Sequence, residues 1–169
     1  AGVRDYEICP AGVVEAEFKA AKAVKAQLLC LGSPGYPSIL AEIADPPPVL
    51  WAIGDLALLH QPMIALVGAR NASSLGIRMA RGLARDIGAS GHVVASGLAR
   101  GVDAAAHFGS LESGTVAVLA GGVDVIYPTE NKDLGAQIAE KGLLLSEQPI
   151  GMPPKARHFP ARNRIVSGL

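Results

Sequence analysis

The sequence predicts an α/β protein of the Rossmann-like type, with a mostly parallel sheet and helices on both of its faces. The first observation behind this prediction is a regular alternation after residue 63, in which short apolar segments are joined by amphipathic segments of about 10–15 residues. The second is that these apolar segments carry no Asp, Glu, Lys or Arg, which is typical of parallel strands buried on both faces. The third is the composition, because 50% hydrophobic residues in a chain of 169 suffice for the core of one domain.

The N-terminal part of the chain is predicted to contain a helix, two strands and several turns. Residues 12–27 place Val14, Phe18 and Ala21 on one helical face and charged side chains on the others. Strands are expected at 28–31 and 49–53, with a short helix at 38–43 that Ser38 caps.

The alternating part begins at residue 63 and predicts four more strands. They are expected at 63–67, 92–95, 115–119 and 143–146. The helices that connect and follow them are expected at 74–90, 101–113 and 131–141, and from Arg162 onward. Connections of this length allow successive strands to run parallel.

Three of the loops that follow strands combine glycine with hydroxyl, arginine or amide side chains. The carboxyl ends of parallel strands meet at one edge of the sheet, where helix N-termini present free N–H groups to anions. The residues concerned are Gly68, Arg70, Asn71 and Ser73, then Ser96, Gly97, Arg100 and Gly101, and finally Gly121 and Gly122. Each loop by itself is equally well explained as a tight turn with a helix cap. The three together predict a phosphate-binding edge.

The segment 155–164 is the most unusual part of the sequence. It carries the cations Lys155, Arg157, Arg162 and Arg164 around one aromatic residue, Phe159, and no acidic residue follows Glu147. Single-stranded nucleic acid sites need this combination, because cations contact the backbone and a ring stacks on a base. The alternative is a solvated basic loop with Phe159 in the core.

Asp103 and His107 are the residues most suggestive of catalysis, since they lie four positions apart on one predicted helix. They could form an acid–base pair. We favour a first-turn acid that suits the helix dipole and a hydrogen-bonded histidine, because no nucleophile or metal-ligand set accompanies them. Asp124 and Glu147 are likewise interpreted as loop acids that accept backbone N–H groups rather than as a catalytic pair.

Several classes of protein are excluded or disfavoured. The chain has no G-x-x-x-x-G-K-[ST] phosphate loop and no G-x-G-x-x-G at the first turn, and Ser96 lacks the setting of a hydrolase nucleophile. Its two cysteines match no metal or redox spacing, so we expect no metal and no cofactor. No apolar run reaches the ~18 residues of a membrane span and no signal peptide is apparent, so we expect a cytoplasmic protein without membrane contact.

Several motifs together resemble the bacterial DNA-processing protein DprA (Smf) family. They occur in order over residues 36–169 and are Tyr36-Pro37, Val67-Gly68-Ala69-Arg70, Ser96-Gly97-Leu98-Ala99-Arg100-Gly101-Val102-Asp103, Gly121-Gly122-Val123-Asp124 with Tyr127-Pro128, Ser146-Glu147-Gln148-Pro149, and Phe159-Pro160-Ala161-Arg162-Asn163-Arg164. The resemblance implies an extended Rossmann fold without catalytic activity that binds single-stranded DNA. It further implies a recombination mediator that protects incoming strands, helps to load the RecA recombinase during natural transformation, and forms a homodimer at full length.

The resemblance also assigns residues and boundaries. It implies that the DNA site comprises Gly68, Arg70, Ser96, Gly97, Gly101, Gly121, Gly122, Lys155, Phe159, Arg162, Asn163 and Arg164. Residues 1–27 resemble the end of the family's N-terminal helical domain, and residues 28–169 resemble its Rossmann-like domain. The sequence stops at Leu169 just after a new helix begins, so we expect a fragment that lacks the C-terminal part.

The alternative function is that of a nucleotide-binding protein, or of an enzyme similar to nucleoside-monophosphate phosphoribohydrolases. Those enzymes use a P-G-G-x-G-T loop. The corresponding stretch here, 119–124, has the two glycines but neither the proline nor the Gly-Thr pair, which disfavours the enzyme.

Overall fold

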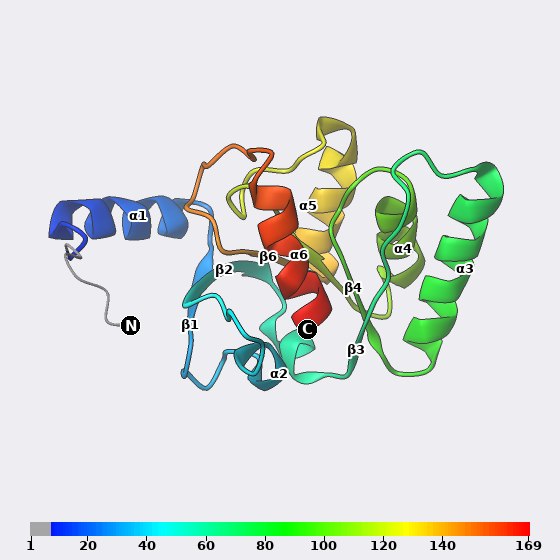
Figure 1. Ribbon diagram of the computed structural model, residues 1–169, viewed down its shortest axis with the longest axis horizontal. Coiled ribbons are helices and arrows are strands. Elements are labelled where there is room, and N and C mark those ends of the chain that lie inside the picture. Colours follow the sequence, from blue (N-terminus) through cyan, green and yellow to red (C-terminus); the bar gives the residue numbers. More distant parts are fainter. Residues whose placement is uncertain (1–7) are drawn as a thin grey trace.

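The sheet holds six strands in the order β1-β2-β6-β5-β4-β3 (Figure 1). A computed structural model describes residues 8–169. The strands are β1 (Gln27–Cys30), β2 (Val49–Gly54), β3 (Met63–Ala65), β4 (Val93–Ser96), β5 (Thr115–Val118) and β6 (Leu143–Ser146). The four strands from β3 to β6 are parallel, whereas β2 runs antiparallel to both β1 and β6. The predicted mostly parallel sheet is confirmed, and the antiparallel β2 is the part that the pattern did not specify.

Helices cover both faces of this sheet, as predicted. They are α1 (Ala11–Ala23), α2 (Ser38–Ala41), α3 (Ser74–Ala89), α4 (Val102–Ser110), α5 (Lys132–Lys141) and α6 (His158–Gly168), with short 3₁₀ turns η1 (Leu56–His60) and η2 (Thr129–Asn131). Successive residues of a strand point to opposite faces, so Val116 and Val118 pack with Ile165 of α6 while Ala117 packs with Ile138 of α5. On the same face as α5, Val94 of β4 packs with Ala84 of α3 and Ala106 of α4. In Figure 1, α6 accordingly lies in front of the sheet and α5 behind it.

The largest departure from the predicted elements concerns α6. It begins at His158, four residues before the expected Arg162, so Phe159 to Arg164 are helical and do not form a basic loop. The buried residues His158, Arg162, Ile165 and Val166 follow the spacing of one helical face, which packs onto the sheet. Pro160 does not prevent this start, because a helix tolerates proline in its first turn.

The remaining differences lie at element ends. The first helix ends at Ala23 instead of 27, β3 ends at Ala65 instead of 67, and Pro37 occupies the cap position of α2 that was assigned to Ser38. α1 projects beyond the sheet in Figure 1 and contacts it through its C-terminal half, where Phe18 meets Trp51 edge to face at 6.0 Å. Residues 1–7 of the predicted N-terminal segment lie outside the described residues. The division at residue 27 stays a prediction. Nowhere in residues 8–169 is a helix both long and apolar enough to cross a membrane.

Candidate nucleic-acid interface

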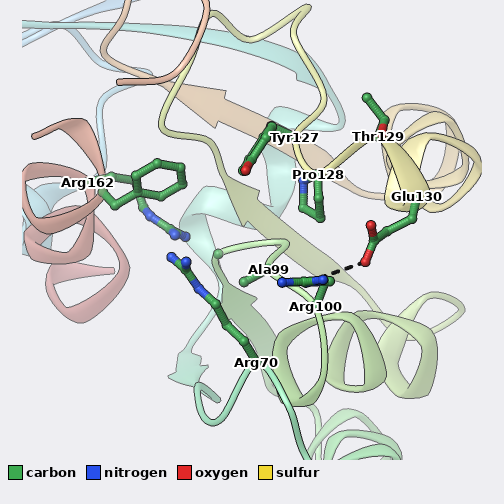
Figure 2. A pocket seen from close by; sticks show the side chains of 10 residues that line it. Arg70, Ala99, Arg100, Tyr127, Pro128, Thr129, Glu130 and Arg162 are labelled. Carbon is green, nitrogen blue, oxygen red and sulfur yellow. Dashed lines mark ion pairs between the residues drawn. The ribbon is translucent and has the colours of Figure 1, made fainter. Parts of the chain in front are cut away.

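A pocket of about 230 Å³ lies where the loops after β3, β4 and β5 meet the start of α6 (Figure 2). Its lining comes from four separate parts of the chain: Arg70 after β3, then Gly97, Ala99 and Arg100 after β4, Tyr127 to Glu130 after β5, and Phe159 and Arg162 in α6. This is the carboxyl edge of the parallel strands, where the sequence predicted an anion site. The structure therefore brings two of the predicted loops together with Phe159 and Arg162 of the basic segment, whereas Lys155 and Arg157 line neither this pocket nor the hollow beside it.

The chemistry of the pocket is cationic and aromatic. The guanidinium of the exposed Arg70 lies 5.3 Å from the centre of the Phe159 ring, and this ring lies 5.9 Å from that of Tyr127. Phe159 is half-buried, so its position lies between the two predicted ones, an exposed ring that stacks on a base and a ring in the core. The Arg70 guanidinium covers one face of the Phe159 ring, and the adjoining Tyr127 ring is 51% exposed, so that it can contact a base.

Arg162 forms the floor of the pocket and is almost fully buried, at 5% exposure. One of its terminal nitrogens donates to the carbonyl oxygen of Val118 at 3.0 Å, and its Nε has no partner among the described residues. Burial lowers the pKa of Arg162, and the charge of Arg70 acts in the same direction while Asp103 opposes both. Figure 2 shows the guanidinium groups of Arg70 and Arg162 pointing toward one another. Two cations that face each other favour an anion between them.

Asp103 holds two of the site loops in place. Its carboxylate accepts the backbone N–H groups of Gly68 at 3.3 Å, Gly97 at 3.2 Å and Ala99 at 3.4 Å. The same region is supported by Asn131, whose side-chain amide donates to the carbonyl oxygens of Leu98 and Ala99. Asp103 is thus occupied by backbone donors from the loops after β3 and β4.

His107 is fully buried and hydrogen-bonded away from Asp103. Its Nδ1 lies 2.7 Å from the hydroxyl oxygen of Thr115, and that hydroxyl donates to the carbonyl of Val94 at 2.9 Å. The Thr115 oxygen is therefore an acceptor for Nδ1–H, and Nε2 is buried without a hydrogen-bond partner among the described residues. Burial, followed by the charge of Arg162, lowers the pKa of His107 to about 3. His107 is hydrogen-bonded, as one of the two interpretations expected, and its Nδ1 is directed at Thr115 and not at Asp103.

The glycines of the first two loops permit close packing within the protein. A Cβ on Gly97 would overlap the guanidinium of Arg162. Gly101 has φ 75°, and a Cβ there would collide with the carbonyl oxygens of Ala69 and Arg70. These two glycines are required because the loops after β3 and β4 and the buried arginine occupy the same small volume.

The third glycine pair is not brought to the pocket. Gly121 and Gly122 are buried beneath the segment 149–154, which runs between β6 and α6. A Cβ on Gly121 would lie 2.7 Å from the carbonyl oxygen of Met152, and one on Gly122 would lie 2.5 Å from that of Pro149. Because this connection covers them, the structure does not bring this predicted part of the DNA site to the pocket. The loop after β5 lines the pocket farther along, through Tyr127 to Glu130.

The predicted hydroxyl and amide residues mainly serve the fold. Ser96 is fully buried and donates to the carbonyl of Leu66 at 2.7 Å, so its side chain does not reach the pocket. Ser73 caps α3 by accepting the N–H of Gly76 at 3.2 Å, which was one of the predicted explanations of this loop. Asn71 is exposed and lines none of the pockets described here.

The cations of the basic segment divide into free and paired side chains. Lys155 and Arg157 are exposed and form no ion pair within residues 8–169. Arg164 is different, because its two terminal nitrogens bind the Glu147 carboxylate at 2.8 and 2.6 Å and its Nε lies 3.2 Å from Asp45. The hydrogen bond to Glu147 raises the pKa of Arg164. Arg164 is therefore committed to an internal pair before any ligand arrives.

The other acids near the site also have defined partners. Glu130 lies 3.5 Å from Arg100 in an ion pair whose two side chains are each 55% exposed. Asp124 accepts the N–H of Gly151 at 2.8 Å, as predicted for a loop acid. Glu147 was assigned the same role and instead pairs with Arg164.

A second hollow of about 550 Å³ adjoins the first and shares Arg70, Ala99 and Arg162 with it. It continues past Gly68 and Val67 and along α6, where the exposed Asn163 also lines it. Together the two hollows form a groove instead of a closed cavity.

Tyr127, Glu130 and Asn131 were not among the predicted site residues. The signal that could have found them is their position, since they lie between the glycine pair after β5 and the next helix. Within the described chain, no three His, Cys, Asp or Glu side chains are grouped so as to hold a metal ion.

A parallel sheet whose strand ends carry arginines and two contacting aromatic rings defines a Rossmann-like protein with a cationic groove at the carboxyl edge of its sheet. The family model described as DNA recombination-mediator protein A matches residues 27–169. The chain therefore belongs to this family, as the motifs indicated.

Similar curated proteins carry the names of the same family. The chain is 44% identical to Protein Smf of a Synechocystis strain over 149 residues, which are 85% of this chain and 37% of the relative. It is 43% identical to DNA processing protein DprA of Bacillus subtilis over 142 residues, which are 82% of this chain and 48% of the relative. The chain thus spans less than half the length of these relatives.

Solved structures of relatives share the fold. DNA processing protein A of Streptococcus pneumoniae matches with a TM-score of 0.85 at 37% identity, over 95% of this chain and 55% of that chain. A structure of DNA processing protein A from Helicobacter pylori, described as giving insight into its single-stranded DNA binding mode, matches with a TM-score of 0.77 at 34% identity. That match covers 84% of this chain and 65% of the other.

Proposed function

We propose that this chain binds single-stranded DNA in the groove at the carboxyl edge of its parallel strands. The observation that carries the proposal is the exposed Arg70 guanidinium stacked on Phe159 and facing the buried Arg162. Phosphates would lie between the two guanidinium groups, and a base would stack beside Phe159. The single-stranded DNA binding described for the Helicobacter pylori relative supports the same ligand class.

The shape of the site favours a polymer over a small molecule. The second hollow, at about 550 Å³, lies within the range of typical ligand pockets of about 300–1,000 Å³, but the first pocket, at about 230 Å³, is smaller than that range. It opens into the second hollow through shared residues, so a strand can enter and leave. The alternative, binding of a mononucleotide or phosphoribohydrolase-like chemistry, would need the pocket to hold one nucleotide by itself.

In the whole protein, we propose the role of a recombination mediator that resembles DprA. This role comprises protection of incoming strands, help in loading the RecA recombinase during natural transformation, homodimer formation at full length, and action in the cytoplasm. We propose that the protein acts by binding and not by catalysis. The support is that Asp103 is occupied by backbone N–H groups and His107 is buried and neutral.

The number of free cations sets the expected salt dependence. Five neutralised phosphates would give a slope of log affinity against log salt of about −3.5. Among the cations of the predicted DNA site, only Arg70, Lys155 and Arg157 are exposed without an ion pair within residues 8–169, and three such contacts give about −2. We therefore expect a slope between these two values, depending on how far Arg100 and Arg162 contribute.

The test is fluorescence anisotropy with labelled oligo-dT and a matching duplex at two salt concentrations. We expect oligo-dT to bind more tightly than the duplex, and Arg70→Ala to weaken oligo-dT binding at least about tenfold. Lys22→Ala, which removes one exposed cation on α1, is the matched control and should bind like the parent. Equal affinity of Arg70→Ala and the parent, or displacement of oligo-dT by a mononucleotide at equal concentration, would refute the proposal.

A further inference from the structure

Besides Arg70 and Phe159, the described residues contain a second stacked arginine and phenylalanine, on the outer surface of α3 and α4. The guanidinium of Arg81 lies 5.7 Å from the centre of the Phe108 ring. Phe108 is 45% exposed, although an aromatic ring on a helix usually packs inward. The function proposed above does not use this pair, and no core cluster includes the ring.

The pair is part of a basic stripe. Arg78, Arg81 and Arg85 are all exposed and are spaced three and four residues apart on α3, which places them on one face of the helix. The acidic residue of this helix, Asp86, pairs with Arg85 and leaves the other two arginines without an ion pair within residues 8–169. The stripe therefore has a net positive charge and contains one exposed ring.

Close packing of the two helices fixes the ring beneath the guanidinium. Helices α3 and α4 lie side by side in Figure 1. A Cβ on Gly109 would collide with the carbonyl oxygen of Arg81 and lie 2.9 Å from the Cβ of Ala84. Glycine at this position lets the helices approach closely, which brings the neighbouring Phe108 into contact with Arg81. The platform is preorganised by the helix pair, unlike a side chain on a loop.

The stripe is within reach of the groove. Helix α3 starts directly after the loop that carries Arg70, and its capping residue is Ser73. With a rise of about 1.5 Å per residue, Arg78 lies about 7 Å and Arg85 about 18 Å along the helix from that cap. A strand that leaves the groove past Arg70 would thus meet Arg78 first and the Arg81–Phe108 pair next.

We propose that Arg78, Arg81 and Phe108 form a second contact site for the same DNA strand, so that the binding surface continues from the groove along α3. The inference rests on the proposed function and extends it. Arginines would contact phosphates, and a base would stack against the exposed face of Phe108, which repeats the chemistry of Arg70 and Phe159. Short strands would fill the groove alone, and longer strands would use both sites.

The experiment compares oligo-dT of about 5 and about 15 nucleotides, which brackets the site sizes of single-strand binding domains. The first variant is the double substitution Arg78→Gln and Arg81→Gln on α3. The control is the double substitution Lys19→Gln and Lys22→Gln on α1, which removes the same charge. We expect the first pair to weaken binding of the longer strand at least about fivefold and to flatten its salt slope by about 1.4, with the shorter strand unaffected. The control pair should change neither.

A second measurement tests whether DNA contacts position 108. In Phe108→Trp, the longer strand should quench the fluorescence of the added tryptophan and the shorter strand should not. The parent, whose only tryptophan is Trp51 at 6% exposure, provides the background signal. The inference is overturned if the longer strand binds the arginine variant with parental affinity and slope, or if both strands weaken equally. Absence of binding by the parent to either strand would instead refute the proposed function, and this extension with it.

Discussion

Replacing His107 with asparagine should remove a large part of the acid sensitivity of this protein. The asparagine amide can take over the donor role of Nδ1 toward Thr115, and it does not titrate. In the folded protein burial lowers the pKa of His107 to about 3, against 6.5 for a free side chain. Since the unfolded chain binds this proton first, acid favours unfolding.

The magnitude follows from the difference between the two pKa values. Stability from the neutral imidazole is fully present above pH 6.5 and is lost as the pH falls toward 3. The loss is about 1.4 kcal/mol per pH unit, or about 5 kcal/mol over the whole interval. Between pH 7.5 and 5.0 the parent should therefore lose about 2 kcal/mol more than His107→Asn.

Urea denaturation at these two pH values, followed through the single tryptophan Trp51, measures this difference. The comparison uses the change with pH for each protein, so the cost of the substitution at neutral pH cancels, as do the carboxylates that both proteins share. Equal pH dependence of parent and variant would refute the assignment of His107 as a buried neutral histidine and reopen its interpretation as an acid–base residue.

Two further substitutions separate folding from binding. Arg164→Gln should lower the unfolding free energy by about 2 kcal/mol, because it leaves the largely buried Glu147 without its bidentate partner, and should change oligo-dT affinity less than about twofold. Urea titration and anisotropy on the same samples check this, and weakened DNA binding at full stability would contradict it. Gly97→Ala should displace the guanidinium of Arg162, lose a charge-assisted hydrogen bond of about 1.5–3 kcal/mol, and weaken oligo-dT binding. Gly82→Ala in α3, where a Cβ meets nothing within 4 Å, is the control that should cost no stability, and equal behaviour of the two alanine variants would argue against the Gly97 contact.

The sequence predicted most of the fold because the relevant signals are local. Alternation of uncharged strands with amphipathic helices located every strand of the parallel part within about two residues. The start of α6 was wrong because Pro160 and four cations concealed a buried face. That face becomes visible only when the sheet packed against His158 and Ile165 is present.

The candidate site could be predicted less completely, since it depends on which side chains meet. The loops after β3 and β4 were recognised from glycine and arginine at strand ends, and the structure brings them together. Gly121 was expected at the phosphate-binding edge, and it is covered by the connection from β6 to α6, which is distant in sequence. Tyr127, which lies in the turn after these glycines, lines the pocket although it was not predicted as a site residue.

The sequence by itself determined the order of strands and helices along the chain and the presence of arginines near the carboxyl edge of the sheet. The tertiary structure decided what each arginine can do. The sequence does not distinguish Arg70, Arg162 and Arg164 from one another. In the structure, Arg70 is exposed and contacts the Phe159 ring, Arg162 is buried under the groove, and Arg164 is paired with Glu147. The reason is physical: burial and ion pairing depend on groups far away along the chain, and only the docking of α6 on the sheet brings those groups within a few ångströms.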